Sequence, residues 1–121
     1  MAEHRTGLVA VVDDDPAVLD SLRLLLEVAG HRVAIYASAT SFLDDCLAQP
    51  ACLILDYHMP YMSGLELAER LCVQGVRVPV LLITSSPSAA LLARATRLGI
   101  EKVLEKPPDE AELLNFVAAH Y

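Results

Sequence analysis

Three consecutive acidic residues, Asp13 to Asp15, directly follow the apolar run Leu8–Val12. A run this short and this rich in β-branched residues is typical of a buried strand. The acids would then leave the strand at its carboxyl end, where open α/β sheets place their ligand sites. Two unit charges ~4 Å apart repel by roughly 4 kcal/mol at an effective dielectric constant of about 20, so crowded carboxylates favour a bound cation. Oxygen ligands suit Mg²⁺, and phosphate chemistry is therefore the first hypothesis.

Three other segments carry polar residues at matching positions, each at the end of an expected strand. They are Asp56 after Cys52–Leu55, Thr84 and Ser85 after Val78–Ile83, and Lys106 after Lys102–Glu105. These residues are distant from one another in the sequence. A doubly wound parallel sheet would bring them to one edge, because its strands end on the same side.

Together these residue types fit phosphoryl transfer, which needs a nucleophile in line, a metal ion that neutralises charge, and donors around the equatorial oxygens. Asp56 is the candidate nucleophile, because carboxylates form acyl phosphates in covalent catalysis. Asp14, with Asp13 behind it, is the candidate Mg²⁺ site. Lys106 is expected to pair with a phosphoryl oxygen as a point charge, and Thr84 to donate its hydroxyl to another.

The elements that would position these residues alternate between strand and helix. Strands are expected at 8–12, 32–36, 52–55, 78–83 and 102–105. The helices are expected from Asp15-Pro16 to a stop at Gly30, from a cap at Ser38 to about Leu47, over Leu65–Cys72, from a cap at Ser86 with Pro87 to Gly99, and from Asp109 with Glu112 in an acidic form of the capping box. This alternation predicts an α/β fold with a doubly wound, five-stranded parallel sheet and five helices.

Composition and charge limit the class of protein. The chain has 121 residues, of which 55% are hydrophobic, so one domain with a real core is expected at 8–121, after a flexible N-terminal tail at 1–7. The net charge of −7 disfavours direct nucleic-acid binding by this segment. Three cysteines without a C-x-x-C pair are expected to act as small apolar residues, namely Cys46, Cys52 and Cys72.

No membrane contact is predicted from the sequence. No apolar stretch approaches the ~20 residues of a membrane span. The first apolar run, Leu8–Val12, ends in three acids and therefore does not fit the apolar core of a signal peptide. A cytoplasmic location is expected.

Four motifs, in this order, resemble the response-regulator receiver domain of two-component signalling, which has a flavodoxin-like fold. They are Val11–Asp15, Leu55–Pro60 with Ser63-Gly64, Ile83–Ser85 and Glu105–Pro107. The resemblance extends from Leu8 to Tyr121. It implies that Asp56 accepts a phosphoryl group from a phosphohistidine on a partner sensor histidine kinase.

The resemblance also implies a ligand set and a switch. Mg²⁺ would be held by Asp14, Asp56 and the backbone carbonyl of His58, with Asp13 acting partly through water. Thr84 would move toward the new phosphoryl group, and Lys106 would bind it. In such domains the peptide bond before Pro107 is commonly cis.

The chain departs from the receiver pattern at two positions. Receivers usually carry Tyr or Phe three residues before the lysine, and this chain has Val103, so the signal would have to pass through packing or loop motion. His58 is less usual at its position, which in this family tunes, together with the position of Ser86, how long the acyl phosphate survives. We hypothesise that His58 alters the hydrolysis rate.

An interface is expected on the side formed by the helix before residue 99, strand 102–105 and the last helix. Leu92 and Leu114 lie off the inward stripes of their helices and mark this face. In receivers this face typically dimerises or contacts an output domain. The run Ser63–Leu67 and the motif Glu105–Pro107 resemble receivers that are joined to helix-turn-helix DNA-binding domains, which suggests transcription regulation.

Two alternatives remain open at the level of sequence. One is a pseudo-receiver, an interaction module that is never phosphorylated. The other is a small aspartate-nucleophile phosphatase, which is disfavoured because His58 stands where a second acid is needed. In the favoured interpretation the domain is not an enzyme toward other substrates and catalyses only the phosphorylation and dephosphorylation of its own aspartate.

Overall fold

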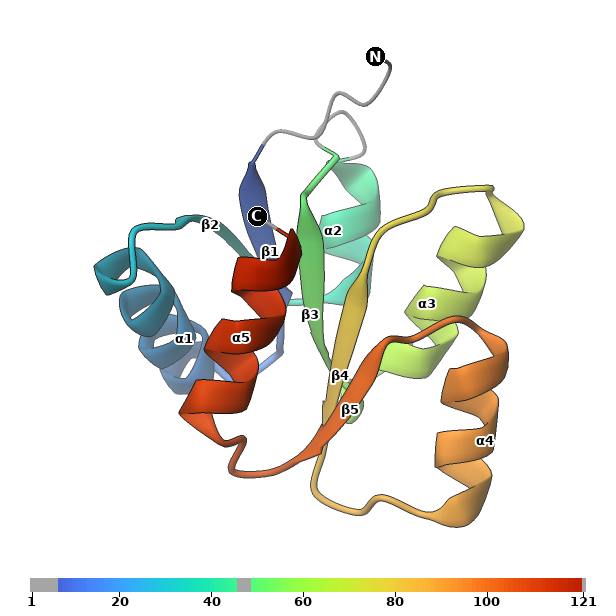
Figure 1. Cartoon of the computed structure of the whole chain (residues 1–121). Helices are drawn as coiled ribbons and strands as arrows, with labels where there is room; N and C mark the ends of the chain where they lie inside the picture. Colours follow the sequence, from blue (N-terminus) through green and yellow to red (C-terminus); the bar gives the residue numbers. More distant parts are fainter. Residues whose placement is uncertain (1–6, 46–48, 121) are drawn as a thin grey trace.

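The computed structural model describes residues 7–45 and 49–120 (Figure 1). The elements follow one another as β1 (Leu8–Val12), α1 (Pro16–Val28), β2 (Arg32–Tyr36), α2 (Ala39–Asp44), β3 (Cys52–Asp56), α3 (Gly64–Val73), β4 (Val80–Thr84), α4 (Ala89–Arg97), β5 (Lys102–Glu105) and α5 (Glu110–His120). The flexible tail predicted at 1–7 lies outside the described residues except for Gly7. Cys46 and Leu47 also lie outside them.

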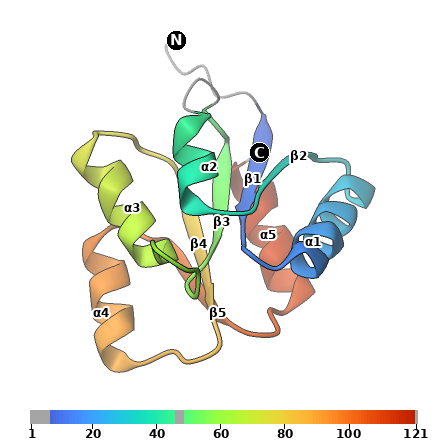
Figure 2. The ribbon, with the colours of Figure 1, turned by 180° about the vertical axis from the view of Figure 1, so that it is seen from behind.

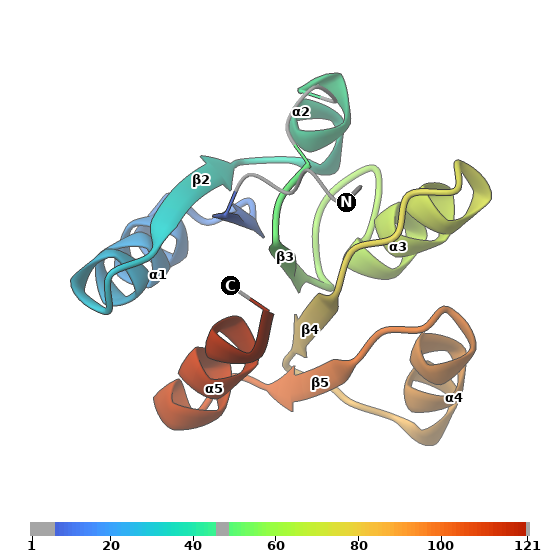
Figure 3. The same ribbon diagram turned by 45° about the horizontal axis from the view of Figure 1, so that its top comes forward.

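The five strands form one parallel sheet in the order β2-β1-β3-β4-β5. Figure 3 shows α1 and α5 on one face of this sheet and α2, α3 and α4 on the other. The predicted doubly wound α/β fold is therefore confirmed. All strands end at the same edge, which is the lower edge in Figure 1.

Side chains along β1 point alternately to the two faces of the sheet, so this short apolar run contributes to the core on each face. Val9 and Val11 pack in the cluster that includes residues of α1 and α5, whereas Ala10 and Val12 pack in the cluster that includes residues of α2, α3 and α4. Because both faces are covered, a central strand needs apolar residues at every position. The strands β3 and β4 are accordingly buried along their whole length.

Each of the five described helices begins at a side-chain cap. The Asp15 carboxylate accepts a hydrogen bond from the Ala17 N–H at 2.9 Å, and Pro16 is the first residue of α1, as predicted. Ser63 and Glu66 form a full capping box at α3. Before α5, Asp109 accepts from the Glu112 N–H at 3.0 Å.

Two predicted helix boundaries were wrong. The cap of α4 is Ser88 rather than Ser86: α4 begins at Ala89, and the Ser88 hydroxyl accepts from the Leu91 N–H at 3.1 Å. Ser86 instead belongs to the turn after β4, where its N–H donates to the Thr84 hydroxyl. The helix α2 ends at Asp44 rather than near Leu47, because the Asp45 N–H bonds to the Phe42 carbonyl three residues back and tightens the last turn.

The fourth strand begins at Val80, two residues later than predicted. Pro79 has no N–H to donate to a ladder, although its carbonyl accepts from the Leu53 N–H at 2.9 Å. Cys52 is buried in the core, as predicted, but Cys72 is exposed on α3, contrary to the prediction. Within the described residues, no helix has the length and apolarity that crossing a bilayer requires.

Candidate functional site

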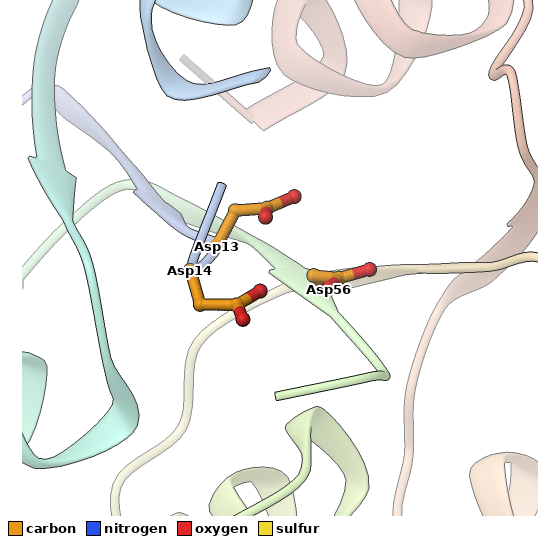
Figure 4. Close-up of side chains that lie close together, drawn as sticks. All are labelled: Asp13, Asp14 and Asp56. Atoms are coloured by element: carbon orange, nitrogen blue, oxygen red, sulfur yellow. The ribbon is translucent and has the colours of Figure 1, made fainter. Parts of the chain in front are cut away.

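Three aspartates meet at the edge where the strands end. Asp13 and Asp14 follow β1 directly, and Asp56 is the last residue of the neighbouring strand β3. One carboxylate oxygen from each lies within 4.8 Å of the others, and Figure 4 shows the three side chains gathered together. Asp13 and Asp56 are buried, with 3% and 2% of their surface exposed, while Asp14 is exposed. The predicted acidic cluster is therefore present.

Lys106 extends from the end of β5 to the same cluster. Its Nζ lies 2.7 Å from Oδ1 of Asp56, and 33% of its side chain is exposed. Burial alone would lower the pKa of Lys106, but the hydrogen bond and the negative charge of Asp56 outweigh it, so this pKa is raised above its ordinary value. The Lys106-Pro107 peptide bond is cis, as the resemblance led us to expect.

Asp13 has a raised pKa. Burial raises its pKa from 3.8 to about 6, and repulsion from Asp56 and Asp14 acts in the same direction. The hydrogen bond from the Asp15 N–H, 2.9 Å from Oδ1 of Asp13, opposes this rise, as does the charge of Lys106. Burial, reinforced by the neighbouring carboxylates, therefore makes the ionised form of Asp13 costly at this edge.

These residues fit a divalent metal ion. The cluster offers only carboxylate oxygens, which are the ligands of hard cations such as Mg²⁺. Oδ1 of Asp56 is buried and, apart from its ion-pair contact with Lys106, has no hydrogen-bond partner in the described part of the chain. Three ionised carboxylates beside one ammonium leave two negative charges, which a divalent cation balances.

Thr84 lies at the end of β4, next to β3. Ile83 pairs with Asp56 in the sheet register, so Thr84 stands one residue beyond that pair. Its side chain is fully buried, and its hydroxyl accepts a hydrogen bond from the N–H of Ser86 at 3.1 Å. The Thr84 carbonyl accepts from the Lys106 N–H at 2.9 Å, which joins the ends of β4 and β5. The backbone segments that carry the Thr84 hydroxyl and the Lys106 ammonium are thus hydrogen-bonded to each other.

His58 and Ser86 lie at the rim of this edge. Both residues are exposed, and the His58 ring packs edge-on against Tyr57 with ring centroids 4.8 Å apart. The imidazole is not part of the acidic cluster. The group that the resemblance assigns to metal binding is the His58 backbone carbonyl, for which the side chain is not needed.

Gly64 allows α3 to pack closely against the site, a contact that was not predicted from the sequence. A Cβ at this position would lie 2.4 Å from the Asp56 carbonyl oxygen and 3.0 Å from Cδ1 of Leu82. The Gly64 N–H donates to the Tyr57 carbonyl at 3.1 Å. The start of α3 therefore rests directly on the backbone of Asp56, and the Ser63-Gly64 motif was the only signal of this contact in the sequence.

The predicted interface residues lie around the edge strand β5. Val103 is partly buried and packs against the core cluster that includes Leu91 and Ala95 of α4. Leu92 is 44% exposed on α4, whereas Leu114 on α5 is partly buried against the opposite core cluster. These two leucines belong to opposite layers of the fold.

One ion pair and one hydrogen bond connect α5 to β5 and to the residue before it. Lys102 Nζ lies 3.1 Å from Oε1 of Glu112, which connects β5 to α5. His120, near the end of α5, contacts the carboxylate of Glu101 through Nε2. The predicted inward stripe of α5 is present, because Leu113, Phe116 and Val117 are buried and His120 is partly buried.

Comparison with known proteins points to one family. A family model described as the response regulator receiver domain matches residues 9–118. The chain is 39% identical over 112 residues to the transcriptional regulatory protein FixJ of Azorhizobium caulinodans, covering 92% of this chain and 53% of the relative. It is 34% identical over 116 residues to the response regulator protein TodT of Pseudomonas putida strain F1, covering 95% and 51%.

The solved structure of the response regulator StyR has the same fold. It superposes with a TM-score of 0.83 at 36% identity, covering 93% of this chain and 58% of that one. The chain spans about half the length of the curated relatives it matches.

Proposed function

This chain belongs to the response regulator receiver domain family, and on that premise we propose that it is a phosphoryl-accepting signalling switch. Asp56 takes a phosphoryl group from a phosphohistidine on a sensor histidine kinase. The observation that carries the proposal is the Asp56 carboxylate, which is buried, lies 2.7 Å from the Lys106 ammonium, and is grouped with Asp13 and Asp14. Crowded, buried acids are costly as structural residues, and such groups concentrate at functional sites.

Transfer of the phosphoryl group needs no reactant other than Asp56 and the phosphohistidine. An oxygen of Asp56 forms a bond to phosphorus while the bond from phosphorus to the donor imidazole nitrogen breaks. The electron pair stays on that nitrogen, and the donor, which carries a proton on its other nitrogen, leaves as neutral imidazole. The Lys106 ammonium, paired with Asp56 before transfer, then pairs with a phosphoryl oxygen.

Magnesium is the proposed cofactor. Asp13, Asp14 and Asp56 would hold it together with the backbone carbonyl of His58. When bound, the ion supplies positive charge that stabilises the transferring phosphoryl oxygens. Asp14 is exposed, so the ion could reach the site from solvent on that side. Asp13 is buried and would hold the ion from the protein side.

The new phosphoryl group adds roughly −1.5 to −2 charge and strong acceptor oxygens at the end of β3. The Thr84 hydroxyl, which accepts from Ser86 before transfer, exchanges that partner to donate to a phosphoryl oxygen. Val103 packs against the core cluster that includes Leu91 and Ala95 of α4. Movement of the loop after β4 would therefore reach the face formed by α4, β5 and α5 through packing rather than through ring rotation.

This face, with Leu92 and Leu114, is the proposed contact for an output domain or a second copy of the chain. Because FixJ is named a transcriptional regulatory protein, transcription is the proposed output. The domain itself would bind neither nucleic acid nor membrane, and it would act in the cytoplasm, where kinases obtain ATP. It would catalyse only the phosphorylation and dephosphorylation of Asp56, with His58 and Ser86 tuning the lifetime of the acyl phosphate.

Incubation with Mg²⁺ and acetyl phosphate tests this function. The intact mass should rise by one phosphoryl group, and the gain should disappear in Asp56→Asn and when EDTA replaces Mg²⁺. An unchanged mass in the unmodified chain would contradict the proposal and favour a pseudo-receiver. Continuous release of phosphate from small phosphate esters would instead favour a phosphatase.

A further inference from the structure

Tyr61, in the turn between β3 and α3, has a strained backbone. Its φ of +69° makes it the only residue other than glycine with a positive φ in the described ranges 7–45 and 49–120. The Met62 N–H donates to the Pro60 carbonyl at 2.8 Å, which closes a three-residue γ-turn with Tyr61 at its centre. This conformation is costly for a residue with a Cβ, whereas glycine adopts it freely.

The Tyr61 side chain makes no contact with the described residues that would offset this strain. It is fully exposed, at 103% of its reference surface, and its ring and hydroxyl contact none of the described residues through a hydrogen bond or ring pair. A large aromatic side chain held in solvent on a strained turn is therefore unexplained by the fold. Tyrosine is among the residues that most often anchor protein interfaces, because it buries a large area at low entropic cost.

A groove of about 380 Å³ begins at Tyr61 and is lined by Met62, Glu66, Glu69, Arg70 and Val73. The two acids have partners, since Glu66 caps α3 at Ser63 and Glu69 faces Arg94 of α4 at 3.9 Å. Arg70 is exposed and forms no ion pair within the described part of the chain. Val73 is 83% exposed. The groove thus offers apolar surface at both ends and one available cation.

The position of the turn indicates the partner. Asp56 has only 2% of its surface exposed, and Tyr61 stands in the turn that leaves the same strand. Figure 2 shows this turn at the end of the sheet where the strands finish. A protein that carries a phosphohistidine must rest on the loops of this edge to bring phosphorus to Asp56, whereas a small phosphodonor need not touch them.

We propose that Tyr61 and the α3 groove form a docking surface for the protein that donates the phosphoryl group, with Tyr61 as an aromatic anchor and Arg70 facing an acidic side chain of that protein. This inference rests on the proposed function of Asp56. It makes Tyr61 a determinant of partner recognition rather than a catalytic residue.

The test compares two donors on the same variants of the full chain. Acetyl phosphate with Mg²⁺ reports the chemistry at Asp56, and purified phosphorylated sensor kinases from FixJ-type and TodT-type systems report protein docking. Tyr61→Gly removes the ring and relieves the turn, Tyr61→Phe keeps the ring as the matched control, and Arg70→Glu reverses the charge.

Tyr61→Gly should slow transfer from the kinase at least 10-fold, Arg70→Glu should slow it severalfold, and Tyr61→Phe should stay within twofold of the unmodified chain. All three should accept from acetyl phosphate at the normal rate. Equal kinase rates for Tyr61→Gly and the unmodified chain would overturn the inference. An equal loss of rate for Tyr61→Gly with acetyl phosphate would also overturn it. The same holds if no kinase transfers a phosphoryl group to the unmodified chain although acetyl phosphate does. Failure of the unmodified chain with acetyl phosphate would overturn the function of Asp56 instead.

Discussion

Within the acidic cluster, burial of the Asp13 carboxylate is unfavourable when this group is ionised. Its pKa is about 6 in the folded domain against 3.8 without the fold. The folded state therefore binds this proton more tightly, so the contribution of Asp13 to the free energy of unfolding is most favourable below pH ~4 and declines as the pH rises through about 6. Above that pH, burying the ionised carboxylate destabilises the domain when no cation is present.

We predict that Asp13→Asn is more stable than the unmodified chain at pH 7 to 8 without metal, by roughly 1–3 kcal/mol. The amide oxygen still accepts from the Asp15 N–H, so only the charge is removed. Urea unfolding at a series of pH values measures the difference, which should shrink toward zero near pH 4. Saturating Mg²⁺ should reduce or reverse it. A difference that does not change with pH would contradict the assignment of the cost to this carboxylate.

His58 is expected to set the lifetime of the acyl phosphate. Its exposed ring packs on Tyr57, directly beyond the strand that ends in Asp56. We predict that His58→Asn changes the rate of dephosphorylation severalfold while leaving the unfolding midpoint nearly unchanged, because among residues 7–45 and 49–120 the imidazole makes only this exposed ring contact. The decay of phosphorylated protein after removal of acetyl phosphate measures the rate. An identical decay in both proteins would rule out this role.

At the scale of the elements, the packing of α3 on β3 sets the geometry of Asp56. A methyl group at Gly64 would stand 2.4 Å from the Asp56 carbonyl oxygen, so backbone must move to admit it. We predict that Gly64→Ala lowers the free energy of unfolding by about 1–3 kcal/mol and slows phosphorylation by acetyl phosphate about 10-fold or more. Unfolding and phosphorylation are measured on the same preparation.

Gly99→Ala is the matched control for this change. Gly99 has a φ of +79° and open space where a Cβ would lie, so its substitution strains the backbone at the end of α4 without touching the site. It should lose stability and still accept a phosphoryl group at close to the normal rate. Equal rates for the two variants would show that Gly64 matters only for folding.

How well a feature could be predicted from the sequence depends on which interactions determine it. Strand order and the meeting of Asp13, Asp14 and Asp56 were predictable, because buried parallel strands read as apolar runs and their ends must share an edge. The start of α4 was not, because Ser86 and Ser88 both flank Pro87 and both are good capping residues; in the structure the Ser86 N–H bonds back to the Thr84 hydroxyl, and Ser88 caps the helix. The turn at Tyr61 was not predictable either, because a positive φ is expected at glycine and Tyr61 carries no such signal.

At the scale of the whole molecule, phosphorylation should change association through the face of α4, β5 and α5. Lys102 and Glu101 hold α5 against this face through Glu112 and His120, so a shift of β5 is passed to α5. We predict that the phosphorylated chain dimerises or binds an output domain, and that Leu92→Ser weakens this binding without slowing phosphorylation. Sedimentation with and without acetyl phosphate measures it. A phosphorylated chain that stays monomeric and binds the same partners as Leu92→Ser would contradict the prediction.

The most direct test of the central claim is a crystal structure with Mg²⁺ and beryllium trifluoride, which mimics a phosphoryl group on a carboxylate. We predict beryllium bonded to Asp56, Mg²⁺ on Asp13 or Asp14 and on Asp56, the Lys106 ammonium on a fluorine, and the Thr84 hydroxyl moved from the Ser86 N–H to another fluorine. A mimic bound elsewhere, or Thr84 and Lys106 left in their present contacts beside a modified Asp56, would contradict it.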